Sequence, residues 1–164
     1  MLLIDKVDKK SYGAKELGLE KGDSIISFNG YPTEDILDYV YYDGQETFTM
    51  DVLTKDGETV TVEVDKYEDE SLGLTFADDG LKIKTCYNDC IFCFVKQMPC
   101  GMRPTLYVKD DDYRQSLLYG NFVTMTNVSD ADLDRIIRLQ FSPLYVSVQA
   151  MNGEVRKKML NNRF

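Results

Sequence analysis

Three cysteines lie within one short stretch of the chain, Cys86, Cys90 and Cys93, separated by three residues and then by two. Thiolates are strong ligands for iron and zinc, and three of them on one loop can point at a common centre. A structural zinc site needs four ligands, so three cysteines leave one coordination position open to a group that is not protein. The spacing therefore predicts a metal centre, and Cys100 is the only other cysteine in the chain.

The residue content excludes several kinds of chemistry. The sequence contains no histidine, which rules out histidine general bases, Ser-His-Asp triads and histidine-ligated zinc. Residues 1–4 are apolar but lead directly into charged residues, so the sequence indicates neither a signal peptide nor a membrane span. We expect a soluble, cytoplasmic protein with no membrane partner. In a reducing compartment, closely spaced cysteines are more often metal ligands than disulfides.

Charge is distributed unevenly along the chain. Residues 1–80 carry 20 acidic and 7 basic side chains, whereas residues 81–164 carry 8 acidic and 12 basic ones, together with all the arginines and cysteines. This change predicts two domains, 1–78 and 79–164. The basic excess of the second part is small and scattered, so we expect no nucleic-acid partner.

The first part has the pattern of an α+β domain. Residues 4–7 and 24–28 read as strands, and residues 47–54 and 58–64 alternate around a Lys-Asp-Gly turn, which predicts a hairpin. Thr33 is the expected cap of a helix whose apolar face contains Ile36, Leu37, Val40 and Tyr41.

This order of elements, with the phrase Gly18-Leu19-Glu20-Lys21-Gly22-Asp23 and the later pair Asn29-Gly30, resembles a PDZ domain of the bacterial, circularly permuted kind. The resemblance implies that a loop containing Ser71, Leu72, Gly73 and Leu74 is the one that binds peptide carboxylates. Glu68, Asp69 and Glu70 precede this loop, and no lysine or arginine lies between Lys66 and Lys82. A carboxylate there would meet like charge, so we expect a docking unit whose groove is engaged intramolecularly or by a protein, with no free-peptide ligand.

The second part alternates strand and helix patterns. Residues 81–85 read as a strand that ends at Cys86, and residues 122–127 and 144–150 read as two further strands. Helices are expected from Asp110, from Ser129, which forms a capping-box pattern with Asp132, and from Glu154. Strands joined by helices predict a parallel sheet.

At the cysteine loop the sequence resembles the radical SAM superfamily, because Phe92 precedes the last cysteine of the Cys-x3-Cys-x2-Cys signature. Further phrases are similar to bacterial proteins that join a PDZ-like domain, a radical SAM domain and a C-terminal domain of unknown function 512. They are Lys109-Asp110-Asp111-Asp112-Tyr113-Arg114, Gly120-Asn121-Phe122 and Leu144-Tyr145-Val146-Ser147-Val148. The resemblance implies a partial (β/α) barrel. Because a full barrel needs about 200 residues or more, we expect a truncated, N-terminal fragment.

The resemblance also implies an activity. Cys86, Cys90 and Cys93 would hold a [4Fe–4S] cluster whose free iron chelates S-adenosylmethionine, and reductive cleavage of this cofactor would give a 5′-deoxyadenosyl radical. The full-length protein would be an oxidoreductase of unknown substrate, supplied with electrons by a flavodoxin or ferredoxin, and this chain alone is expected to be inactive. By analogy and from the expected strand ends, the cofactor-binding candidates are Phe92, Gly120, Asn121, Thr126, Asn127 and Gln149.

An alternative is an interaction module in which all four cysteines hold a structural zinc ion. This alternative depends on Cys100, which is either a fourth ligand or a small buried hydrophobic residue, the second being the more frequent role of such a cysteine.

Overall fold

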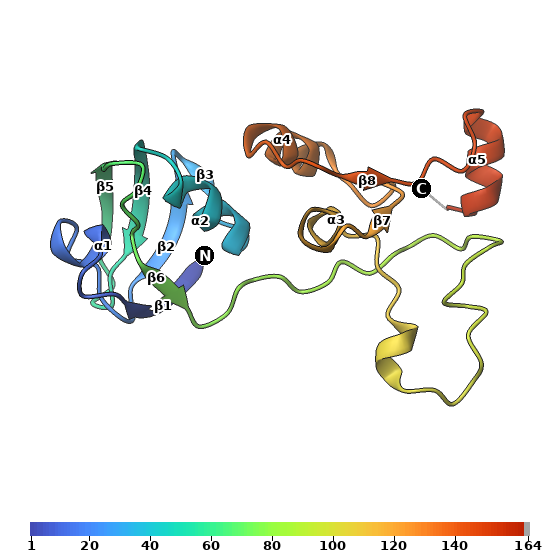
Figure 1. The fold of residues 1–164 in the computed structure, drawn as a ribbon, viewed down its shortest axis with the longest axis horizontal. Coiled ribbons are helices and arrows are strands. Elements are labelled where there is room, and N and C mark those ends of the chain that lie inside the picture. Colours follow the sequence, from blue (N-terminus) through green and yellow to red (C-terminus); the bar gives the residue numbers. More distant parts are fainter. Residues whose placement is uncertain (163–164) are drawn as a thin grey trace. The chain divides into compact units, whose positions relative to one another are not determined.

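The computed structural model describes residues 1–162, which divide into two compact units, unit 1 (Met1–Leu81) and unit 2 (Lys82–Phe164) (Figure 1). Unit 1 contains six strands and two helices among its residues: β1 Leu2–Val7, α1 Tyr12–Lys15, β2 Ser24–Phe28, β3 Tyr31–Pro32, α2 Ile36–Asp43, β4 Thr47–Leu53, β5 Thr59–Asp65 and β6 Leu74–Phe76.

The strands of unit 1 form one antiparallel sheet in the order β5-β4-β2-β1-β6, with β3 paired to β2. Along β4, Phe48, Met50 and Val52 alternate with partly exposed residues, so every second side chain enters the core. Helix α2 contributes Tyr42, whose ring stacks on Phe28 with 4.8 Å between the centroids. The alternation that predicted the hairpin is therefore the alternation that builds the core.

The start of α2 differs from the prediction. Asp35, and not Thr33, caps the helix: its carboxylate accepts from the Leu37 N–H, and Asp38 completes a capping box. Thr33 continues the preceding hairpin instead, since its N–H donates to the Ile26 carbonyl oxygen. Its buried hydroxyl has no hydrogen-bond partner within residues 1–162. Two acids that satisfy the helix N–H groups reciprocally make a better cap than one threonine.

Unit 2 contains less regular structure. Among its described residues the 3-10 helix η1 (Pro104–Tyr107) comes first, after a stretch without helix or strand, and three helices and one strand pair follow it in the chain (Figure 1). The remaining elements are α3 Tyr113–Tyr119, β7 Phe122–Val123, α4 Asp130–Arg138, β8 Tyr145–Val146 and α5 Gly153–Leu160. Strands β7 and β8 pair in parallel, Phe122 with Tyr145 and Val123 with Val146, and α4 connects them.

Residues 81–85 do not form the predicted strand, and Thr85 makes only an isolated antiparallel bridge with Asp110. Side chains take two of the backbone groups that a neighbouring strand would bind. The Lys84 N–H donates to Asp112 Oδ2 at 3.0 Å, and Arg114 Nη2 donates to the Lys82 carbonyl oxygen at 2.6 Å. Strands β7 and β8 are also shorter than predicted, and they form one parallel strand pair among the described residues of unit 2.

The capping box at the start of α4 is confirmed, with Ser129 and Asp132 exchanging hydrogen bonds. From this helix Arg135 enters the interior of unit 2, where it donates to the Tyr113 hydroxyl at 3.1 Å and lies 5.5 Å from the centroid of the Phe141 ring. Its burial is therefore compensated by a hydrogen bond and a cation–π contact.

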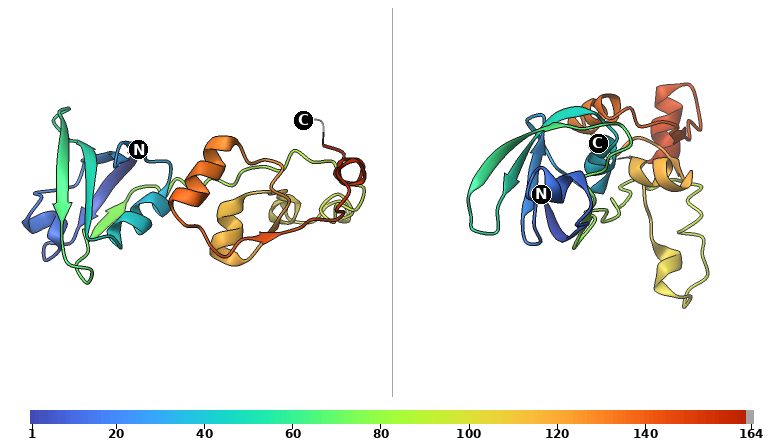
Figure 2. Two further views of the ribbon diagram at one scale, coloured as in Figure 1. Left: turned by 90° about the horizontal axis from the view of Figure 1, so that it is seen from above. Right: turned by 60° about the vertical axis from the view of Figure 1, so that its left-hand side comes forward.

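Helix α5 lies on the side of unit 2 toward which the arrow of β8 points (Figures 1 and 2). Arg156 of α5 donates to the carbonyl oxygens of Thr124 and Val148, at 2.7 and 3.0 Å. These two residues follow β7 and β8, so α5 is bound at the carboxyl ends of both parallel strands.

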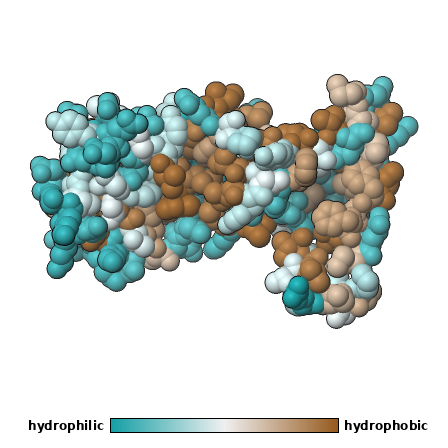
Figure 3. Space-filling view, viewed as in Figure 1, coloured by the Kyte–Doolittle hydropathy of each residue, from teal (hydrophilic) through white to brown (hydrophobic). Residues whose placement is uncertain are grey.

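Surface character differs between the units. In the view of Figure 3 hydrophilic colours dominate unit 1 and hydrophobic colours are more frequent on unit 2. Unit 2 exposes Phe94, Phe122, Ile137 and Met151, among others. Within residues 1–162, no helix has the length and apolar character needed to cross a bilayer.

Candidate functional site

The three cysteines lie on a loop without regular structure that three other segments of unit 2 hold in place. At its start, the Cys86 N–H donates to the Lys109 carbonyl oxygen at 2.8 Å. Farther along, the N–H groups of Asp89 and Ile91 donate to the carbonyl oxygens of Leu160 and Met159, at 3.0 and 3.1 Å. These carbonyls belong to the last turn of α5, where a helix has no internal donors for them. The loop and the helix end therefore satisfy each other.

A third anchor is Asn88, which lies between the first two cysteines and is 1 % exposed. Its amide nitrogen donates to Thr124 Oγ1 at 3.0 Å and to Thr126 Oγ1 at 2.8 Å, and its amide oxygen accepts from Thr126. Asp111, also buried, accepts from the Thr124 N–H and hydroxyl. The loop is thus fastened to the chain that leaves β7.

The thiols of all three cysteines contribute to one cavity of about 230 Å³ in unit 2. No disulfide involves these thiols. Apolar and polar side chains share the remaining wall, which consists of Phe92, Phe94, Val95, Phe122, Lys109, Asp110, Asp111, Thr124, Ser147 and Gln149.

Burial raises the pKa of the Cys86 thiol, and the nearby Asp111 carboxylate raises it further. Burial likewise raises the pKa of the Cys90 thiol, with the neighbouring sulfurs of Cys86 and Cys93 acting in the same direction. The Lys109 ammonium opposes both shifts. Lys109 is the one basic side chain in the cavity wall, and it favours thiolate over thiol together with backbone hydrogen bonds, which for Cys86 come from Asn88.

The structure brings together only some of the predicted cofactor-binding residues. Phe92 and Gln149 line the cavity with the cysteines, whereas Gly120 and Asn121 do not. Thr126 bonds to Asn88, and Asn127 donates to the Thr85 carbonyl oxygen at 2.8 Å. In the structure Thr126 holds the middle of the cysteine loop and Asn127 holds the residue that precedes it.

Sequence reasoning missed Lys109, Asp111 and Thr124 as parts of the cavity. The Lys-Asp-Asp-Asp phrase predicts a helix that starts at Asp110, but the observed N-cap is Asp112. Lys109 and Asp111 therefore precede the helix and line the cavity with the cysteines. The predicted parallel pairing was the signal that could have found Thr124, because residues that follow two parallel strands lie at the same edge of the sheet.

Backbone strain marks this edge. Met125 follows β7 with a φ of 60°, and Gln149 follows β8 with the same φ of 60°, a left-handed conformation that costs about 1 kcal/mol for a residue other than glycine. Such residues gather at functional sites, where surrounding contacts maintain them.

Cys100 is exposed and is absent from the cavity wall, so the expectation that it is buried is wrong. Within residues 1–162, no three cysteine, histidine or acidic side chains are grouped closely enough to hold a single metal ion. The described residues therefore contain no four-cysteine zinc site.

In unit 1, the loop expected to bind a peptide carboxylate already contacts a carboxylate of the chain. Asp43, at the end of α2, accepts from the Leu72 N–H and from the Ser71 hydroxyl, each at 2.7 Å. The next N–H groups are also engaged, since Gly73 donates to Ser71 Oγ and Leu74 donates to the Tyr39 hydroxyl at 3.1 Å.

The prediction that a carboxylate at this loop would meet only like charge is wrong, because lysines also lie beside the loop. An open cavity of about 750 Å³ beside Ser71, Gly73 and Leu74 is also lined by Lys6, Lys9 and Lys10, which come from β1 and the residues after it. Antiparallel pairing of β1 with β6 brings these lysines to the loop. A count of neighbours in sequence could not detect them.

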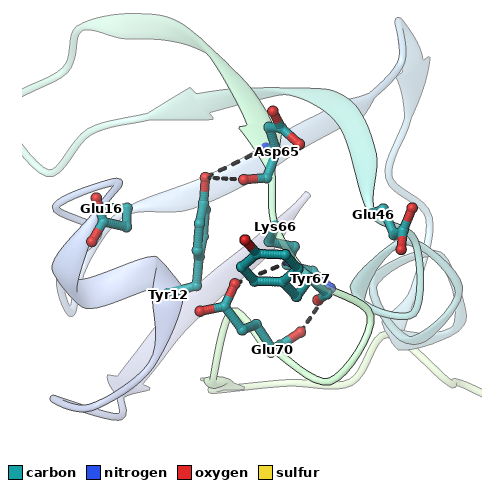
Figure 4. Close-up of a pocket in the computed structure, with 7 residues that line it drawn as sticks. All are labelled: Tyr12, Glu16, Glu46, Asp65, Lys66, Tyr67 and Glu70. Carbon is teal, nitrogen blue, oxygen red and sulfur yellow. Dashed lines mark hydrogen bonds between the residues drawn. The ribbon is translucent and has the colours of Figure 1, made fainter.

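A second cavity of unit 1, of about 520 Å³, is mostly acidic and contains Glu16, Glu46 and Glu70 (Figure 4). The buried Lys66 ammonium lies at this cavity and donates to the Glu70 carbonyl oxygen at 2.7 Å. Tyr12 donates to the Asp65 carbonyl oxygen at 2.9 Å. These contacts hold the connection between β5 and β6 in place, so the polar groups at this cavity have a structural role.

Taken by itself, unit 2 is a small α/β unit with a thiol-lined cavity at the carboxyl end of a parallel strand pair. A comparison with protein families matches residues 66–164 to a radical SAM-like domain. Since this match spans more than half of the chain, the protein belongs to the radical SAM-like domain family. A comparison with curated proteins gave no match.

Proposed function

We propose that unit 2 binds a [4Fe–4S] cluster through Cys86, Cys90 and Cys93 and takes part in reductive cleavage of S-adenosylmethionine. The observation that carries the proposal is the presence of all three free thiols in the wall of one cavity, in a chain of this family. A bound cluster would supply one electron to the sulfonium of S-adenosylmethionine, giving methionine and a 5′-deoxyadenosyl radical, with a flavodoxin or ferredoxin as the electron source.

The residues present fit this group. Each thiolate of a four-iron cluster binds its own iron atom, so the sulfurs need not meet around one point, as they must for a single zinc ion. The cavity of about 230 Å³ is smaller than the roughly 300–1,000 Å³ typical of small-molecule sites. The cavity would therefore hold the cluster, and S-adenosylmethionine bound to it would extend beyond the cavity wall.

Other side chains of the wall have roles that their chemistry supports. The Lys109 ammonium offsets the negative charge of three thiolates and the attached cluster. Phe92 contributes an apolar ring to the cavity wall next to Cys93 in the sequence. Gln149 lines the cavity in its left-handed conformation after β8, and its amide, which lies beside Ser147 and Val148, would need to turn from these neighbours to hydrogen-bond a bound cofactor.

Anaerobic reconstitution with iron and sulfide tests the proposal. We expect about four iron and four sulfide per chain, together with the broad visible absorption of an iron–sulfur protein. Replacing Cys86, Cys90 and Cys93 together by serine should abolish both. About one zinc per chain with no sulfide would overturn the proposal in favour of a structural metal site.

For unit 1 we propose a docking or positioning role without a free-peptide ligand. The support is that Asp43 engages the Leu72 N–H and the Ser71 hydroxyl, the two groups that an incoming carboxylate would use. Calorimetric titration of the chain with peptides that have free C-terminal carboxylates should show no heat of binding. Binding at low micromolar concentration would contradict this role, and the lysines beside the loop make the test a demanding one.

A further inference from the structure

We infer that Asn88 is the positioning residue of the cysteine loop, acting through a buried network with Thr124, Thr126 and Asp111. The inference rests on the proposed function, because it assigns a role toward the cluster that the three thiols would bind. Asn88 touches neither cluster nor cofactor in this role. It sets where the thiols point.

The network is directional. The Asn88 amide donates to the Thr124 hydroxyl at 3.0 Å, and this hydroxyl donates to Asp111 Oδ2 at 2.6 Å. The Thr126 hydroxyl lies within 3.0 Å of both Asn88 amide atoms and 3.3 Å from Asp111 Oδ2. An amide, two hydroxyls and a carboxylate therefore satisfy one another, and such chains of hydrogen bonds reinforce their members in a low-dielectric interior.

Burial gives the network its importance. Asn88 is 1 % exposed and Asp111 is 3 % exposed, whereas Thr124 and Thr126 are half-buried, so loss of a partner leaves the Asn88 amide or the Asp111 carboxylate with an unsatisfied buried polar group. Asp111 and Thr124 also line the cavity, which places the far end of the network beside the thiols. In addition, Lys109 Nζ donates to the Asn88 carbonyl oxygen, so the main chain and the side chain of this residue are both fixed.

The position of Asn88 in the sequence links the network to the thiols. It stands two residues after Cys86 and two before Cys90, in a loop without regular secondary structure. Release of its side chain therefore removes one of the contacts that hold the backbone between two ligands. Groups that orient metal ligands in this way typically change metal affinity by about 10- to 100-fold when they are removed.

The test uses the full chain with Asn88→Ala, the near-isosteric Thr126→Val and the double variant, each reconstituted anaerobically. Transfer of iron to an excess of chelator gives the rate of cluster loss, and electron paramagnetic resonance of the reduced cluster reports its environment. Gln115→Ala, on α3 and away from the cavity wall, is the folding control. Far-UV circular dichroism before reconstitution shows whether each variant is folded.

We expect Asn88→Ala to lose iron about 10-fold faster than the unsubstituted chain and to show an altered resonance spectrum. Thr126→Val should also increase the rate of iron loss. The double variant should lose iron no faster than Asn88→Ala alone, because Asn88→Ala already removes the contact between residues 88 and 126. Gln115→Ala should behave as the unsubstituted chain does.

Two results would count against different claims. If the unsubstituted chain takes up no iron and sulfide, the proposed function itself fails. If it is loaded, and Asn88→Ala and Thr126→Val keep the same rate of iron loss and the same spectrum, the positioning role is overturned while the proposed function stands.

Discussion

Removal of the Asp112 carboxylate should lower the free energy of unfolding of unit 2 strongly. Asp112 is fully buried and accepts from Arg114 Nε and Nη2 at 2.9 and 2.7 Å. Burial alone would raise its pKa, but the hydrogen bonds from Arg114 and from the Lys84 N–H outweigh that effect, and the pKa is lowered. Asp112 also caps α3.

Asp112→Ala leaves the 5 %-exposed Arg114 without this partner and removes the cap. Breaking a buried ion pair costs about 3–5 kcal/mol, and loss of a cap about 1 kcal/mol, although the two share one carboxylate and do not add fully. A unit of this size has a free energy of unfolding of about 4–12 kcal/mol. We therefore expect a loss of about 3–5 kcal/mol, which takes unit 2 close to unfolding.

Hydrogen exchange measured by mass spectrometry separates the units in one experiment. Peptides that cover residues 82–86 and α3 should exchange at least about 100-fold faster in Asp112→Ala, the factor that corresponds to about 3 kcal/mol. Peptides from β4 and β5 should be unchanged. The matched control is Asp134→Ala on the exposed side of α4, with an expected change below about 0.5 kcal/mol. Protection of residues 82–86 that changes by less than about 1 kcal/mol would refute our account of how this segment is held.

Three further predictions concern other contacts. Burial alone would raise the pKa of Asp132, but hydrogen bonds from Lys84 and Ser129 outweigh it and lower the pKa to about 2. The stabilisation from this carboxylate is therefore complete above about pH 4 and is lost as the pH falls toward 2. With screening we expect it to be about 1–2 kcal/mol, and acid unfolding of Asp132→Asn should lack this component. Asp43→Ala should lower the free energy of unfolding of unit 1 by about 1–2 kcal/mol and expose the Leu72 amide to fast exchange, whereas unchanged exchange would contradict the contact. Cys100→Ser should leave iron and sulfide content unaltered after reconstitution, and a loss of either would show that a fourth thiol takes part.

Local signals allowed correct predictions where the partners are close in sequence. The β4–β5 hairpin follows from alternation around a Lys-Asp-Gly turn, and its observed register pairs Thr47 with Asp65 through Leu53 with Thr59. The start of α4 follows from Ser129 and Asp132, three residues apart. In both cases the hydrogen bonds that define the element join residues that one short window contains.

Predictions failed where side chains distant in sequence satisfy the backbone. Residues 81–85 have a strand-like composition, but Asp112 and Arg114 take the hydrogen-bonding positions that a second strand would need. The lysines beside the loop of unit 1 were missed because they are also distant in sequence, and pairing of β1 with β6 brings Lys6 to Thr75. The cysteine spacing predicted the site, whereas nothing within the loop itself indicated its anchors.

The cysteine loop depends on segments that come much later in the chain than the loop itself. Lys109 fixes its start, Thr124 and Thr126 fix its middle, and the last turn of α5 fixes its end through Met159 and Leu160. Because these anchors are 20 to 70 residues away, the loop can gain its structure only after β7, β8 and α5 have come together. The cysteines supply the ligands, and the contacts of the loop with the α/β unit fix where the loop lies.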